Sequence, residues 1–488
     1  MLFKLIPALR NSRLFYWLNK FWRSPFHIAI AAILITISAM FDVGFVCYYI
    51  LMGICLVIPS LFADDMTALI PLAVMLNIGI SKELKSTNTQ IVMGENIQHF
   101  VIFLIAVIVF AFGRLIFDLA TDIERRERFP RLLIGYIAIT VAFCMGGLFS
   151  SYNTINDFSF GLREALALGG FYFYFFYTVD FSKMKGHYFA YLLFFFAFSV
   201  AIQIVVEANR SGLDTMLEVG WGNRSGLGGT LVAAYTGVVY LIIKRKACFA
   251  WIYMILFFFF LTMIGITQCR GAALTAMVML IPSVVLITIF GSPIKRIVFL
   301  LILVIYFITM VSLYFTEPAF FTLCFGRLFN FDFNTWDDFS SHRITIWKTG
   351  LDQFAHNPIC GVGWYQIPDL GFQARYHNTA IQLLAATGIF GTVCYLVHRG
   401  ETLIMTFQRP TLEKSIAFMS ILCILLSSLL DCFLFNIWLG FEYGFLLAFI
   451  EGRDFVPVED VKPTKKTKPG TNVYHTKTGG TTIIINNR

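Results

Sequence analysis

Apolar residues follow one another in runs of roughly 18–20 along almost the whole chain, and short polar segments separate these runs. As an α-helix, a run of this length crosses the hydrocarbon core of a bilayer, because a helix rises about 1.5 Å per residue. The pattern therefore predicts an all-α fold, a polytopic transmembrane helical bundle of about 12–14 spans. The spans are expected at residues 27–41, 45–62, 66–80, 98–113, 132–149, 162–179, 188–206, 227–243, 250–267, 272–290, 297–314, 381–397, 415–430 and 433–450.

Lys and Arg gather in alternate polar segments, and this pattern orients the chain because cytoplasmic loops are enriched in both. The basic clusters are Arg125, Arg126, Arg128 and Arg131, then Lys183 and Lys185, then Lys244, Arg245 and Lys246, then Lys295 and Arg296, then Arg399 and Arg409. All of them fall on one side if the N-terminus is cytoplasmic, so both termini are predicted in the cytoplasm. Losing a single span, such as the short 66–80 run with Pro71, would invert everything after it.

The chain is expected to have three regions. Residues 1–26 form a basic cytoplasmic interfacial segment, residues 27–450 the polytopic membrane domain, and residues 451–488 a polar, disordered cytoplasmic tail. Within the membrane domain, residues 316–380 form one large extracytoplasmic loop, and long ordered loops are usually functional. Residues 342–355 of this loop repeat apolar side chains at near-helical spacing, which is typical of an amphipathic helix on a membrane surface.

Composition supports a membrane protein: 58% of the residues are hydrophobic and 14% are charged. Soluble domains have roughly 45–50% apolar and about 25% charged residues. The net charge of +8 follows from the basic flanks, and no aromatic-basic module for nucleic acid is present in the sequence. The ten cysteines show no zinc spacing, and a disulfide between Cys324 and Cys360 in the outer loop is left open.

Several arginines are predicted on the outer side, where they could bind an anionic substrate. Arg270 lies between two apolar runs, Arg224 lies in a Gly-rich turn, and Arg343 follows a Ser-His pair. The planar guanidinium forms paired charge-assisted hydrogen bonds and stays protonated, which suits a diphosphate. The alternative is that each arginine only anchors a helix end in lipid headgroups.

His377, directly before the 381–397 span, is a candidate general base because an unperturbed imidazole titrates near pH 6.5. It could equally be a polar helix cap. His342 and His356 are weaker candidates. Asp337 and Asp338 could bind a divalent cation or be a solvated pair.

A series of short motifs follows in a fixed order across alternating loops and spans. They are Arg270-Gly271-Ala272, Ser341-His342-Arg343, Asn357-Pro358-Ile359-Cys360-Gly361-Val362-Gly363, His377-Asn378, Gln382-Leu383-Leu384, and Gly388 with Gly391. In this order they resemble the O-antigen ligase and polymerase superfamily of bacterial membrane glycosyltransferases. Cys269 stands where that family usually has Ser, and Arg224 resembles its second outer Arg.

The resemblance implies a lipid-diphosphate-dependent glycosyltransferase, inverting and metal-independent, in the bacterial inner membrane and without a cofactor. Its catalytic residues would be His377, Arg270 and Arg224, with Arg343 and Asn378 as substrate contacts. The donor would be a glycan on undecaprenyl diphosphate. The acceptor would be the lipid A core in the ligase branch and another lipid-linked glycan in the polymerase branch, and the ligase branch is favoured because one outer loop dominates.

Two other functions compete with this interpretation. A transporter of lipid-linked glycan should show inverted repeats or charges in mid-span, and the expected spans are nearly free of ionisable groups. A metal-dependent oligosaccharyltransferase would use acidic residues in the first outer loop, where only Asp42 is present.

Overall fold

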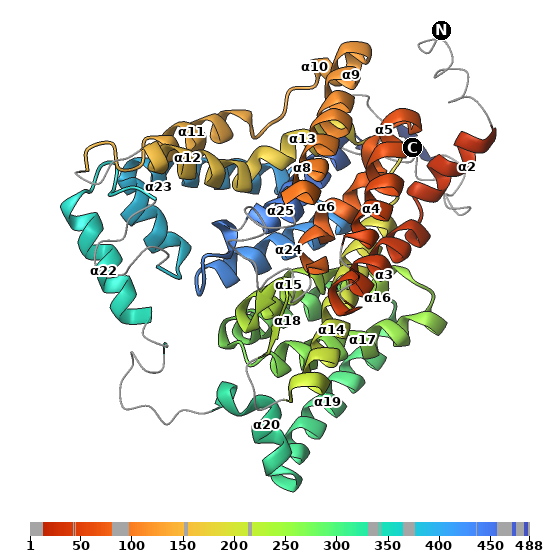
Figure 1. Ribbon diagram of the computed structural model, residues 1–488. Coiled ribbons are helices and arrows are strands. Elements are labelled where there is room, and N and C mark those ends of the chain that lie inside the picture. Colours follow the sequence, from red (N-terminus) through yellow and green to blue (C-terminus); the bar gives the residue numbers. More distant parts are fainter. Residues whose placement is uncertain are drawn as a thin grey trace.

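The apolar runs of the sequence form long helices packed into one bundle (Figure 1). The computed structural model describes residues 13–41, 43, 45–80, 97–150, 155–212, 217–329, 340, 343–364, 376–435, 437–455, 471–474 and 483–486. Helices account for almost all of them, which confirms the predicted all-α membrane bundle.

The first third of the chain is built from short helical pieces joined by π- and 3₁₀-helical turns. The elements are α2 (Arg13–Trp22), α3 (Pro25–Phe41), α4 (Val46–Met52), η1 (Gly53–Val57), α5 (Ile58–Phe62), η2 (Met66–Leu69), α6 (Ile70–Met75), η3 (Leu76–Gly79), α8 (Ile97–Ala106), η4 (Val107–Phe112), α9 (Gly113–Thr121), α10 (Ile123–Glu127), α11 (Leu133–Cys144), α12 (Ile155–Ala165), η5 (Leu166–Gly170) and α13 (Phe171–Thr178).

The remainder contains the longest helices and two small strand pairs. The elements are α14 (Gly186–Ser211), β1 (Glu218–Val219), β2 (Gly222–Asn223), α15 (Arg224–Ala234), α16 (Thr236–Lys244), α17 (Ala247–Ile266), α18 (Arg270–Phe290), α19 (Pro293–Thr316), α20 (Pro318–Phe329), α22 (Arg343–His356), α23 (Thr379–Phe407), α24 (Leu412–Ser428), η6 (Phe433–Phe435), α25 (Ile437–Gly452), η7 (Arg453–Phe455), β3 (Thr471–Tyr474) and β4 (Ile483–Asn486). Strand β1 pairs antiparallel with β2, and β3 with β4. The β3–β4 pair lies in the tail, where the sequence predicted no regular structure.

Seven helices in the described part of the chain are long and apolar enough to cross a membrane, or eight if the bent pair α2–α3 is one span. This makes the protein a multi-pass membrane protein. Several of the other expected spans fall on shorter helices, such as α11 with 12 residues. A helix of that length covers only about 18 Å of the roughly 30 Å core. The expected total of 12–14 crossings therefore stays a prediction.

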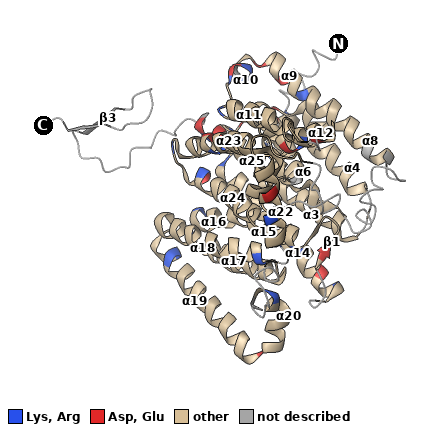
Figure 2. Cartoon of the chain, turned by 90° about the vertical axis from the view of Figure 1, so that its left-hand side faces the viewer, with Lys and Arg blue, Asp and Glu red and all other residues tan. Residues whose placement is uncertain are grey.

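Helices α15 and α16 form the centre of the bundle, and α19 lies at its edge. Contacts with α14, α17, α18 and α24 surround the central pair, and its side chains from Leu227 to Ile243 are buried. Most apolar side chains of α19 point outward instead, and Figure 2 shows α19 without charge along most of its length. An outward apolar surface of this kind suits contact with lipid.

Several of the predicted basic clusters meet at one end of the bundle. Arg131 pairs with Asp454 after α25, and Arg409 donates to the backbone carbonyl oxygen of Asp454. Lys295 at the start of α19 donates to the carbonyl oxygen of Ile243 at the end of α16, 2.6 Å away. Arg399, which the sequence placed in a loop together with Arg409, lies instead inside α23 with its guanidinium buried, because this helix continues to Phe407. The cytoplasmic orientation of this end stays a prediction.

The structure corrects one expectation from the sequence and answers one question that the sequence left open. The spans are not as free of ionisable groups as expected, because Glu442 is completely buried within α25. Glu442 lies within an otherwise apolar run of the sequence, so its carboxyl was not recognised there. The disulfide that the sequence left undecided does not form, because Cys324 and Cys360 are both buried free thiols.

Candidate active site

A cavity of about 660 Å³ lies between the starts of α15, α18 and α22, the end of α20, and the turn after α24. Four arginines line it: Arg224, Arg270, Arg327 and Arg343. The sequence predicted three of them as outer-side candidates from separate segments, and the structure brings these three together. Arg327, from α20, was not predicted.

Three helices begin at this cavity with an arginine as their first residue. Arg224 begins α15, Arg270 begins α18 and Arg343 begins α22. A helix N-terminus carries a partial positive charge and unpaired backbone N–H groups, which favour bound anions. The guanidinium groups add full positive charges at the same place. The cavity therefore suits a ligand with several negative charges, such as a diphosphate.

A tight turn between α17 and α18 positions Arg270. Gln268 in this turn has a positive φ of 52°, and its side-chain amide donates to the carbonyl oxygen of Leu323 in α20. Nε of Arg270 donates to the carbonyl oxygen of Arg327 at 2.9 Å. The turn is thus fastened to α20, and the two arginines are held next to each other.

A short hairpin positions Arg224. The β1–β2 hairpin ends at Asn223, whose side-chain oxygen accepts a hydrogen bond from the backbone N–H of Gly226 at 3.2 Å and caps α15. Ser225 then contacts the thiol of Cys269, with Oγ and Sγ 3.9 Å apart. This contact joins the Arg224 turn to the Arg270 turn. Cys269, the residue that departs from the family pattern, therefore has a packing role.

His377 pairs with Asp431, a cavity-lining residue that was not predicted. Nδ1 of His377 lies 2.9 Å from Oδ1 of Asp431, and Nη2 of Arg343 lies 3.6 Å from Oδ2. Burial by itself would raise the pKa of Asp431, but the hydrogen bond from His377 and the positive charge of Arg343 outweigh it, so the pKa lies below its ordinary value. Since an ionised carboxylate only accepts hydrogen bonds, Nδ1 of His377 is the donor and Nε2 is left to accept a proton.

The backbone of His377 is held in an uncommon conformation. Its φ is +50°, in the left-handed region, which is rare for a residue with a side chain. Tyr376 N–H donates to the side chain of Gln382, and Asn378 caps α23 by accepting from Ala380 and Ile381. Both neighbours of His377 are thus fixed, and backbone strain fixed in this way is common at functional sites.

Asn378 makes contacts that place it in a positioning role. Its side-chain nitrogen donates to the carbonyl oxygen of Leu429 at 2.9 Å, while its oxygen caps α23. The bond to Leu429 ties the His377 turn to the turn that carries Asp431. Its predicted substrate contact stays a prediction.

Residues 255–396 match the family model described as O-antigen ligase. This confirms the predicted resemblance over less than a third of the chain. The matched segment contains Arg270, Arg343 and His377, whereas Arg224 and Asp431 lie outside it. The match supports a membrane enzyme of the ligase or polymerase type. No curated protein matches the chain.

Within the segment that matches O-antigen ligase, the glycine-rich motif at residues 357–363 packs into a break in α23. Gly388 interrupts the helix with φ +64° and ψ −161°, so helical hydrogen bonds are lost around it. The motif replaces them: Val362 N–H donates to the carbonyl oxygen of Ala385 at 2.8 Å, and Ile389 N–H donates to that of Pro358 at 2.8 Å. A Cβ on Gly361 or Gly388 would collide with backbone of the opposite segment. The motif glycines are therefore needed for close backbone approach.

Helix α22, between Arg343 and this motif, is held against α23. A Cβ on Gly350 would lie 2.5 Å from Cγ2 of Ile381 and 2.7 Å from the ring of Tyr376. The helix predicted at residues 342–355 agrees closely with the observed helix, Arg343–His356. Its close packing against α23 places Arg343 next to Asp431.

The other predicted candidates do not join the site. His356 is exposed at the far end of α22 and contacts Asp352 of the same helix. His342, Asp337, Asp338 and Asp42 lie outside the described residues. Among the residues that the structure describes, no group of three His, Cys, Asp or Glu side chains could hold a metal ion.

Signals for the two missed residues were present in the sequence. Asp431 is a single acidic residue in the turn between two apolar runs, on the side predicted to be outside. Arg327 lies in the large outer loop, eleven positions after the last residue of α19 in an otherwise apolar stretch. Neither residue belongs to a motif, so nothing in the sequence linked them to His377 or Arg270.

Proposed function

We propose that the protein transfers a glycan from undecaprenyl diphosphate to a sugar hydroxyl on the lipid A core, at the outer face of the bacterial inner membrane. The observation that carries this proposal is the His377–Asp431 pair beside a cavity with four arginines. A base next to a multiply cationic site fits a hydroxyl nucleophile and a diphosphate leaving group.

In this proposal the arginines bind the donor by its diphosphate. Arg270 and Arg224 form charge-assisted hydrogen bonds to the phosphate oxygens, and the N-termini of α15 and α18 add to the positive potential. When the bond between the anomeric carbon and the phosphate oxygen breaks, negative charge collects on the departing diphosphate. These groups stabilise that charge, which is the role that metal ions have in other transferases.

His377 activates the acceptor. Its Nε2 takes the proton of the attacking hydroxyl while the oxygen bonds to the anomeric carbon, and Nδ1 keeps its hydrogen bond to Asp431. The ionised Asp431 stabilises the imidazolium that forms, as a carboxylate does beside a catalytic histidine. Attack occurs opposite the leaving diphosphate, so the anomeric configuration inverts.

Arg343 connects the two halves of the site. It lines the cavity and also lies 3.6 Å from Asp431, so it can contact phosphate or substrate while keeping Asp431 charged. Arg327, fastened to Arg270, extends the cationic wall.

The polymerase reaction, which joins two lipid-linked repeat units, uses the same donor and is the alternative. Glycan profiles of a deletion strain that expresses His377→Ala distinguish the two. Loss of a ligase leaves bare lipid A core while full-length polymer accumulates on undecaprenyl diphosphate. Cores capped with a single repeat unit would show a polymerase and would refute the ligase assignment.

The exposed His356 provides a matched control, since it is a histidine of the same outer region that makes no contact with the cavity. His356→Ala should restore the wild-type profile. A wild-type profile from His377→Ala at normal abundance would remove His377 as the base.

A further inference from the structure

A second hollow of about 370 Å³ lies between α23 and α24, and its character differs from that of the arginine-lined cavity. Its walls are almost entirely apolar, formed by residues such as Leu383, Leu396, Leu403, Phe418, Leu422 and Leu425. Leu396, Leu403 and Leu429 at its edge are 60%, 44% and 47% exposed. Since these edges face outward from a membrane bundle, the groove opens sideways toward lipid.

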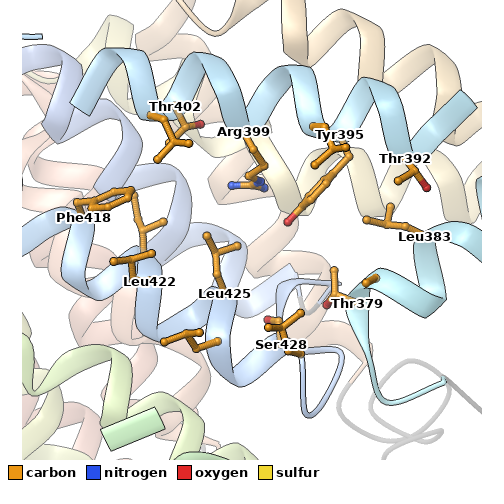
Figure 3. A pocket seen from close by; sticks show the side chains of 16 residues that line it. Thr379, Leu383, Thr392, Tyr395, Arg399, Thr402, Phe418, Leu422, Leu425 and Ser428 are labelled. Carbon is orange, nitrogen blue, oxygen red and sulfur yellow. The ribbon is translucent and has the colours of Figure 1, made fainter. Parts of the chain in front are cut away.

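Among the described residues that line this apolar groove, Arg399 is the one cation. Figure 3 shows Arg399 extending from α23 toward α24, beside Tyr395. All three guanidinium nitrogens are buried. In the described part of the chain the charge meets no carboxylate, and its polar neighbour is the hydroxyl of Tyr395, without a well-formed hydrogen bond. The guanidinium contacts the rings of Tyr395 and Tyr443, 4.6 and 4.9 Å from their centres. Ring contacts alone do not replace the hydrogen bonds that a buried guanidinium loses from water.

From Arg399 the groove extends past Thr402 and Phe418 on one side and to the turn that holds the candidate active site on the other. Thr379 and Ser428 line its other end, and Leu429, also in its wall, accepts the hydrogen bond from Asn378. Asn378 follows His377 directly, and Asp431 comes two residues after Leu429. A molecule in the groove would thus support the two turns that bring His377 and Asp431 together.

We propose that the groove binds one anionic phospholipid, with its phosphate on Arg399 and an acyl chain running along α23 and α24 toward Thr379. The phosphate supplies the missing acceptors for the guanidinium, and the chain covers the apolar walls. A polyprenyl chain by itself would leave Arg399 unpaired, and free phosphate would leave the apolar walls uncovered. The carboxylate of Glu442 does not fill this role, since neither of its oxygens has a hydrogen-bond partner among the described residues.

Native mass spectrometry of the full-length protein in detergent tests this, with phosphatidylglycerol and phosphatidylcholine of identical acyl chains as probes. Wild type should retain one phosphatidylglycerol per chain and bind phosphatidylcholine roughly tenfold more weakly. Arg399→Leu should lose this preference, and Arg399→Lys should keep part of it. Leu425→Trp should exclude the lipid by filling the groove while leaving Arg399 in place. Lys244→Leu, which removes an exposed basic residue at the end of α16, should bind as wild type does.

Equal retention of the two lipids by every variant would overturn the proposal. So would displacement of the bound phosphatidylglycerol from wild type by undecaprenyl phosphate, because the groove would then hold the polyprenyl chain. Displacement of the lipid by millimolar inorganic phosphate would show an anion site without a lipid groove and would also overturn it. Binding is measured without a glycosyl donor, so these outcomes do not depend on the proposed transfer reaction.

Discussion

Nδ1 of His377 lies 2.9 Å from Oδ1 of Asp431, a residue 54 positions further along the chain. The contact joins the start of α23 to the turn after α24, two elements that the sequence separates by an entire helical hairpin. It fixes which imidazole nitrogen carries the proton, and it makes Asp431 a positioning residue of the proposed base.

Asp431→Asn should lower transferase activity by roughly 10²–10⁴-fold, because an amide can donate to Nδ1 and so favour the wrong tautomer of His377. The loss should appear in kcat, with KM for the lipid donor little changed, in assays of purified protein in lipid vesicles. Asp352→Asn, a neutralised carboxylate on the exposed side of α22, should remain active. Equal losses of activity in both variants would show that the removal of any nearby negative charge lowers activity. That result would contradict a specific role of Asp431 beside His377.

Arg270→Lys should fail nearly as badly as Arg270→Ala, because an ammonium group is a point charge without the paired geometry of a guanidinium. The expected defect is weaker binding of the diphosphate donor together with slower transfer. The assay is steady-state transfer from the lipid-linked donor, with and without a chelator, and activity should survive chelation. Strict dependence on magnesium or manganese would contradict the arginine mechanism and turn attention to Asp337 and Asp338.

The sequence predicted a large part of this arrangement. Apolar runs place the helices well, because membrane burial acts on each run separately. Arg270 and His377 were found because they interrupt such runs at their ends. Asp431 and Arg327 were not found, because their roles depend on the packing of α24 against α23 and of α20 against α18. That packing involves residues distant in sequence, and no local pattern reports it.

Gly388→Ala should destabilise the protein strongly. The φ and ψ of Gly388 are suited only to glycine, and such strain costs about 1–3 kcal/mol before the collision with the carbonyl oxygen of Ile359 is added. Gly400→Ala in the same helix is the matched control, since its Cβ would meet nothing within 4 Å. This variant should be neutral or more stable by up to about 1 kcal/mol. Thermal unfolding in detergent measures both, and similar midpoints would contradict the described backbone.

The acid stability of the protein should depend on Asp431. Although burial opposes ionisation, His377 and Arg343 hold the pKa of Asp431 below its ordinary value. The resulting stabilisation is fully present above the unfolded pKa of about 3.9 and is lost as the pH falls through the lower folded value. Wild type should therefore be more stable than Asp431→Asn at pH 5, and the difference should shrink toward pH 3. A difference that grows on acidification would have the wrong sign for this site.

Reporter fusions test the predicted orientation. A reporter that is active only outside the cytoplasm should be active when inserted near Gly371 and silent when fused after Arg488. The expectation rests on the basic clusters that should remain inside. The reverse result would place the arginine-lined cavity on the cytoplasmic side and rule out the proposed reaction site.

The break at Gly388 also constrains how the chain enters the membrane. The carbonyl oxygens of Ala385 and Ala386 accept hydrogen bonds from Val362 and Gly363, so the first turns of α23 are completed by a segment that precedes them in the chain. An apolar helix usually satisfies its own backbone before it meets its neighbours. Here the backbone of α23 is complete only once residues 357–363 are packed against it. We therefore expect residues 357–363 and 385–390 to fold together during biogenesis, and loop exchange between relatives should succeed only if it carries both segments.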